Sequence, residues 1–233
     1  GNNDILPQLA QNLFAPKKYL RGSVSQFELF RKCPFAHFVK YGLKIEERRS
    51  YAFKRYDFGL ILHEVMREYG EFVKRDYGSH WEDVPKEVRK AESIQIVDAI
   101  APRLESEVLL SRANYRHLIE RMKETVLDSI EHLTAWAALS SFQPTYLEEG
   151  FGSYGDKVKL TPLPLKGGFK LSFKGRIDRI DVHSTISYYL VIDYKTHTIA
   201  INLFEVYYGL RLQLLVYLLV GRELLKQSGK ERL

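Results

Sequence analysis

The spacing of apolar residues changes once along this chain, near Gln143-Pro144, and the change separates a helical half from a half that forms a sheet. From about residue 57 to residue 141, apolar residues recur every three or four positions, the spacing of a buried helical face. At residues 169–174 apolar and polar residues alternate, which is typical of a strand with one buried face. The chain therefore combines a helical N-terminal half with a C-terminal sheet.

Two more strands are predicted around a turn at residues 183–185, over residues 175–182 and 188–194. The second is apolar at nearly every position, as in a central strand covered on both faces. Helical spacing returns from about residue 204 to residue 225. Residues 1–22 show little periodicity, so we expect a loosely ordered lead-in, followed by a single domain over residues 23–233.

Composition limits the functional classes. The 233 residues, 45% of them hydrophobic and 27% charged, exclude a disordered or fibrous protein. No apolar run approaches the roughly 20 residues that span a bilayer, so we expect a soluble cytoplasmic protein without a membrane partner. A single cysteine, Cys33, cannot form an internal disulfide or complete a cysteine-based metal site within this chain. The net charge of +6 favours a polyanionic partner, although an ordinary basic domain has the same balance.

The segment Asp193-Tyr194-Lys195 ends the apolar strand with two charged residues, which the strand period places on one face. A carboxylate buried there is costly unless it is paired or binds a metal. An isolated Asp–Lys ion pair is the simpler interpretation. However, Asp178 lies on the preceding strand, and a hairpin can bring Asp178 and Asp193 together. A divalent cation relieves the repulsion between two carboxylates, and Mg²⁺ or Mn²⁺ suits such an oxygen-rich site.

Two helical segments add polar side chains at positions that pack inward. His63 lies on the buried face of the helix expected after residue 57, where a lone histidine is more commonly a core residue than a ligand. Gln213 and Tyr217 lie four residues apart on one helix face, a spacing that a packed amphipathic helix also explains.

Six segments, taken together and in order, resemble a known family. They are Ser23–Glu28 leading to Cys33-Pro34-Phe35, Gly59–Glu64, Phe142–Gly152 with Pro144 and Glu148, Gly175–Asp181, Asp193–Lys195, and Tyr208–Gln213 with Tyr217. The family is the PD-(D/E)XK nucleases of the RecB type, and within it the C-terminal nuclease domains of AddB-type helicase–nuclease subunits. Thr196-His197 departs from the family pattern, which has serine and a small residue after the lysine.

The resemblance implies an α/β fold, with a mixed central sheet flanked by helices, a helical insertion over about residues 78–141 and a catalytic sheet core over about residues 142–226. It also implies roles for individual residues. One or two Mg²⁺ or Mn²⁺ ions would be bound by His63, Asp178, Asp193 and the Tyr194 carbonyl. Lys195 would orient the attacking water and stabilise the transition state. Gln213 and Tyr217 would position the DNA strand or Lys195. Glu148 would complete the outer coordination sphere of the metal or be a solvated carboxylate beside Glu149.

The same resemblance implies a substrate and partners. The activity would be that of a metal-dependent DNA exonuclease, which hydrolyses phosphodiesters of single-stranded DNA delivered by a helicase during the repair of double-strand breaks in a bacterium. The partner would be an AddA-type helicase–nuclease subunit. Candidate contacts to the DNA backbone, each of which could also be a solvated charge, are Lys170, Lys174, Arg176 and Arg179.

Cys33 resembles the first of four cysteines that hold a [4Fe-4S] cluster in the larger parent subunit. The other three would lie beyond this chain, so we expect the fragment itself to be free of the cluster. Two alternatives to the nuclease remain: a catalytically inactive, nuclease-like module that binds DNA or scaffolds a helicase, and a metal-dependent hydrolase of small phosphoesters.

Overall fold

The computed structural model describes residues 5–45, 55–105, 113–153, 156, 158–196 and 200–229, with the backbone alone at residues 55–57, 102–105 and 113–115. The chain divides into two compact units. Unit 1 comprises Gly1–Arg48, Glu149–Ile177 and Ala200–Leu233. Unit 2 comprises Arg49–Glu148 and Asp178–Ile199. Each unit therefore consists of separate segments of the chain.

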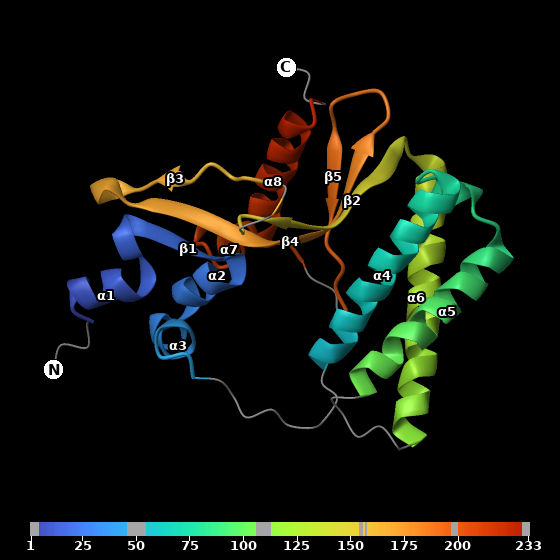
Figure 1. The fold of residues 1–233 in the computed structure, drawn as a ribbon, viewed down its shortest axis with the longest axis horizontal. Coiled ribbons are helices and arrows are strands. Elements are labelled where there is room, and N and C mark those ends of the chain that lie inside the picture. The colour runs from blue at the N-terminus through green and yellow to red at the C-terminus, as the bar shows by residue number, and fades with distance from the viewer. Residues whose placement is uncertain are drawn as a thin grey trace. The chain divides into compact units, whose positions relative to one another are not determined.

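The sheet is mixed and open (Figure 1). The described residues form five strands: β1 (Tyr19–Ser23), β2 (Phe142–Phe151), β3 (Leu163–Pro164), β4 (Lys170–His183) and β5 (Tyr189–Ile192). The order is β1-β4-β2, and both β3 and β5 also pair with β4. The β1 pairing is parallel, whereas the β3 and β5 pairings are antiparallel. The central strand is therefore β4.

This topology corrects the prediction for residues 188–194. Among the described strands, β5 pairs only with β4, and all four of its residues are half-buried. Its apolar residues thus belong to a short hairpin partner, not to a central strand. The buried run lies on β4 instead, where Ile177–Val182 are buried at every position.

Unit 1 surrounds the first half of β4. Its helices are α1 (Pro7–Phe14), α2 (Val24–Lys32), α3 (Pro34–His37), α7 (Leu203–Tyr207) and α8 (Gln213–Gln227), with short turns η1 (Pro16–Lys18), η2 (Phe38–Gly42) and η4 (Lys166–Gly168). The lead-in differs from our expectation, because it contains α1 and most of β1, and β1 pairs with residues 170–174. Ser23 ends β1 and caps α2, since its Oγ accepts a hydrogen bond of 3.2 Å from the Gln26 amide.

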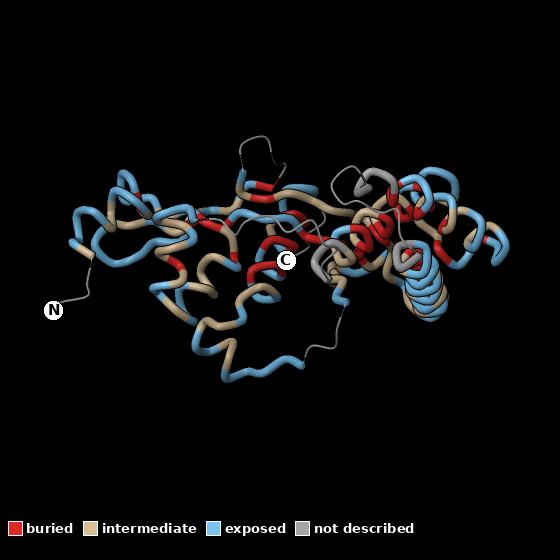
Figure 2. Tube along the Cα trace, turned by 90° about the horizontal axis from the view of Figure 1, so that it is seen from below, coloured by how far each residue is buried: buried red, intermediate tan, exposed pale blue. Residues whose placement is uncertain are grey.

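Unit 2 is built around three helices that lie side by side, α4 (Arg55–Tyr77), α5 (Lys86–Glu105) and α6 (Ala113–Leu139), with the turn η3 (Trp81–Asp83) (Figure 1). Residues at helical spacing, such as Val65, Met66 and Tyr69, are almost fully buried between them. Figure 2 shows buried stretches, in red, along the helical part of the chain. In the part of the chain that the structure describes, we find no helix long and apolar enough to cross a membrane.

Candidate metal centre

Three polar side chains from different elements of unit 2 converge. His63 projects from α4, Glu148 from β2 and Asp178 from β4. The Nδ1 atom of His63 lies 3.2 Å from Asp178 Oδ1 and 3.4 Å from Glu148 Oε1. One donor atom from each residue fits within 4.8 Å of the others. A nitrogen and two carboxylate oxygens at such spacing form a donor set suited to Mg²⁺ or Mn²⁺.

The charges in this cluster are arranged as in a site that binds a cation. The side chain of Asp178 is 8% exposed and that of Glu148 is 12% exposed. Hydrogen bonds to Asp178 first, and to Glu148 second, raise the pKa of His63 to about 10, although burial opposes the rise. A proton on His63 therefore offsets one of the two negative charges, whereas a divalent cation would offset both.

Glu148 lies close to His63, with its Oε1 3.4 Å from the imidazole Nδ1, and its place in a coordination sphere remains a prediction. Its backbone adopts φ of +48° within β2, a left-handed conformation that is uncommon for a residue other than glycine. Strained backbone of this kind is concentrated at functional sites. The family resemblance distinguishes Glu148 from the adjacent Glu149, but no sequence pattern predicts this backbone conformation.

Arg179 pairs with Ile192 in the hairpin of β4 and β5, and Asp178 and Asp193 are the next residues beyond that pair. The Tyr194 amide donates a hydrogen bond of 2.7 Å to Asp178 Oδ2. Burial raises the pKa of Asp193; the ion pair with Lys195 opposes the rise, and the charge of Asp178 adds to it. The two carboxylates thus interact directly.

Asp193 and Lys195 form an ion pair, which was the simpler interpretation of this motif. Both lie beyond the end of β5, so the strand alternation expected for them does not apply. Among the described residues, Asp193 lies outside the converging trio of His63, Glu148 and Asp178. Its role as a metal ligand, and that of the Tyr194 carbonyl, remain predictions.

Gln213 and Tyr217 are joined to each other and to β4 within unit 1. Gln213 Nε2 donates a hydrogen bond of 2.9 Å to Tyr217 Oη, which in turn donates one of 2.8 Å to the carbonyl of Arg176. The start of α8 is fixed as well, because Glu28 Oε1 accepts hydrogen bonds from the amides of Leu212 and Gln213. The pair therefore anchors β4 two residues before Asp178.

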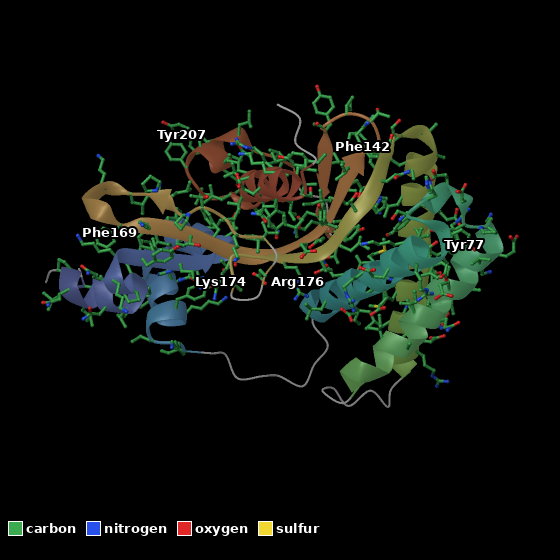
Figure 3. All side chains as sticks on the ribbon, turned by 45° about the horizontal axis from the view of Figure 1, so that its top comes forward. Tyr77, Phe142, Phe169, Lys174, Arg176 and Tyr207 are labelled. Atoms are coloured by element: carbon green, nitrogen blue, oxygen red, sulfur yellow. The ribbon has the colours of Figure 1, made fainter. Side chains whose placement is uncertain are left out.

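The four residues predicted to contact DNA differ in how far they are buried. Lys170, Lys174 and Arg176 are exposed, and Figure 3 marks the last two along β4. Arg179 is fully buried and holds Asp181 through hydrogen bonds of 2.6 and 2.7 Å. The expectation that Arg179 contacts DNA is therefore corrected: this part of β4 is buried at every position, and the ion pair with Asp181 keeps Arg179 in the core of unit 2.

Cys33 lies between α2 and α3 and is half-buried. Its Sγ accepts a hydrogen bond of 3.4 Å from the Ala36 amide and so caps α3. Within the described residues it joins no group of three potential ligands. Its iron–sulfur role in a longer parent protein remains a prediction.

Comparison with known proteins gives consistent results. A protein of Pelotomaculum thermopropionicum, named as a subunit of an ATP-dependent helicase/deoxyribonuclease, is 39% identical over 206 residues, covering 88% of this chain and 18% of that protein. Proteins named in the same way from Desulfitobacterium hafniense and Heliobacterium modesticaldum are 39% and 36% identical and cover 96% and 92% of the chain. The chain spans less than a fifth of the length of these relatives.

The AddB-type resemblance inferred from the six motifs is thus confirmed, and with it the fold class of a mixed sheet flanked by helices. A family model described as the PD-(D/E)XK nuclease superfamily matches residues 21–232, almost the whole chain. This chain belongs to the PD-(D/E)XK nuclease superfamily.

Proposed function

We propose that this chain is the Mg²⁺- or Mn²⁺-dependent DNA nuclease domain of a bacterial helicase–nuclease and hydrolyses phosphodiesters of single-stranded DNA. The observation that carries the proposal is the convergence of His63, Glu148 and Asp178, with the Asp193–Lys195 pair next to Asp178. Family membership and the names of the relatives support the reaction class.

In this proposal the three converging side chains would hold the metal together with Asp193, and Lys195 would contact the substrate. A bound divalent cation would act as a Lewis acid and lower the pKa of the attacking water. Lys195, whose side chain is 32% exposed, carries a positive charge that can reach the non-bridging oxygens of the phosphodiester. The Tyr194 amide keeps Asp178 oriented through its hydrogen bond to Oδ2.

The exposed cations on β4 support a polyanionic substrate. Lys174 and Arg176 precede Asp178 on the same strand, and the chain carries a net charge of +6. We infer that these residues bind the DNA backbone, and that an AddA-type helicase–nuclease partner delivers the strand during repair of double-strand breaks. The names of the relatives, which describe parts of a helicase/deoxyribonuclease, support that assembly.

The test is a cleavage assay on end-labelled single-stranded DNA with Mg²⁺, with Mn²⁺ and with chelator. We expect metal-dependent cleavage that Asp178→Asn abolishes, whereas Glu124→Gln, an exposed acidic position on α6, cleaves as the wild type does. DNA binding without cleavage, under conditions where the wild type binds metal, would favour the inactive scaffolding module. Faster hydrolysis of bis(p-nitrophenyl) phosphate than of DNA would favour a hydrolase of small phosphoesters.

A further inference from the structure

A buried ion pair, Arg179 with Asp181, directly follows Asp178 along β4 and supplies none of the three converging side chains. Arg179 is 0% exposed, and its Nε and Nη2 atoms donate to the two carboxylate oxygens of Asp181. The guanidinium stacks on Trp81, with its Cζ 4.5 Å from the ring centroid, and Trp81 is itself fully buried. The pair is thus fixed from two sides, by a bidentate contact and by an aromatic surface.

One end of this arrangement points toward Tyr194. Among the buried polar atoms of the described residues, Arg179 Nη1 and Tyr194 Oη each lack a hydrogen-bond partner. Tyr194 packs against the buried apolar cluster that contains Trp81, and the Arg179 guanidinium lies over the Trp81 ring, so both groups border the same part of the core. Burial also raises the pKa of Tyr194 to about 12, and the charge of Arg179 opposes the rise. A donor and an acceptor that are both buried and unsatisfied are costly, and one hydrogen bond between them satisfies both.

Tyr194 in turn contacts two of the three converging residues. Its amide binds Asp178 Oδ2, and its ring stands edge-on to His63 with centroids 5.9 Å apart. A shift of the phenol would therefore move the surface against which the imidazole rests and the donor that orients the carboxylate. Tyr194 thus connects both of these ligands to the buried ion pair.

We propose that Arg179 is a positioning residue of the metal centre, which acts by binding the Tyr194 hydroxyl and so fixing the orientation of Asp178 and His63. This inference rests on the proposed function, since it assigns a role within that metal site. A buried ion pair is weak as a source of stability, because apolar residues of similar volume are commonly as stable. A role in orientation explains why charged groups occupy this part of the core.

The test compares Tyr194→Phe, Arg179→Lys and the double variant. Tyr194→Phe removes only the hydroxyl, and Arg179→Lys keeps the charge but loses the bidentate fork. We expect each single change to weaken Mn²⁺ binding, measured by electron paramagnetic resonance of free Mn²⁺, by about tenfold, as for other residues that orient metal ligands. The double variant should bind Mn²⁺ no more weakly than the single variant of lower affinity, because both changes break the same connection.

Val126→Ala is the control for loss of stability alone. Val126 is fully buried on α6 and has no part in the ion pair, so this variant should melt at a lower temperature but keep wild-type Mn²⁺ affinity below its transition. Additive losses in the double variant, or unchanged affinity in Tyr194→Phe, would overturn the positioning role while leaving the metal centre intact. A wild type that binds no Mn²⁺ would overturn the proposed function and this inference together.

Discussion

At the scale of a single residue, the protonation of His63 makes the candidate metal centre sensitive to pH. Its pKa of about 10 lies above the ordinary value of 6.5, so a proton is retained on the folded, metal-free protein at neutral pH. Because the pKa of His63 is higher in the folded than in the unfolded protein, its protonation stabilises the fold fully below pH 6.5. This stabilisation is lost as pH rises through about 10.

Metal and proton compete for His63, because a metal binds the neutral imidazole. We expect Mn²⁺ affinity to rise by about tenfold per pH unit between pH 6 and pH 8, with about one proton released for each ion bound. Calorimetry in buffers of different ionisation enthalpy measures that proton. In His63→Gln the release should disappear; equal release in both proteins would contradict the assignment.

Lys195 and Lys174 are predicted to act differently on the same substrate. Lys195→Gln should lower the cleavage rate on the order of 100-fold and change DNA affinity little, because its charge acts mainly in the transition state. Single-turnover cleavage and fluorescence anisotropy separate the two quantities. A variant that fails to bind DNA would instead make Lys195 a binding residue.

Lys174→Gln is the matched exposed lysine change on β4. This variant should bind DNA more weakly, and the salt dependence of its affinity should be smaller by about one released counterion. The cleavage of bound DNA should be unchanged. Anisotropy titrations over a series of salt concentrations measure the slope. An unaltered slope would remove Lys174 from the DNA contacts.

At the scale of the elements, β4 organises the site. It supplies Asp178 to the centre, places Arg179 in the core, and is fixed at Arg176 by Tyr217. Tyr217→Phe removes both hydrogen bonds of the hydroxyl and should lower the free energy of unfolding by about 1 kcal/mol per bond. Urea denaturation measures this change. An effect no larger than that of Tyr207→Phe, on an exposed residue of α7, would show that the anchor contributes nothing.

Local patterns in the sequence predicted part of this arrangement. Strand periodicity and the intervening turn predicted the hairpin, and Asp178 and Asp193 directly adjoin its last residue pair, Arg179 and Ile192. They did not predict which strand is central, because an apolar run such as residues 189–192 does not reveal how many strands pair with it. The burial of Arg179 and the backbone of Glu148 depend on contacts between residues distant in sequence, so periodicity could not predict them.

At the scale of the whole molecule, the three converging side chains all belong to unit 2. A metal that binds only the folded site stabilises it by mass action, by about 2.7 kcal/mol at 100 times the dissociation constant. That stabilisation appears in the parts of the chain whose opening breaks the site. Metal should therefore slow amide exchange in α4 and β5 more than in the described parts of unit 1.

Hydrogen exchange with and without Mn²⁺ measures the difference. We expect added protection in α4 and β5, including the segment around His63, and little change in α2 or α8. In Asp178→Asn the added protection should be lost throughout, since one of the two converging carboxylates is neutralised. Equal protection across both units in the wild type would mean that the whole domain opens as one cooperative unit, so that metal binding at His63, Glu148 and Asp178 is transmitted to residues that do not contact it.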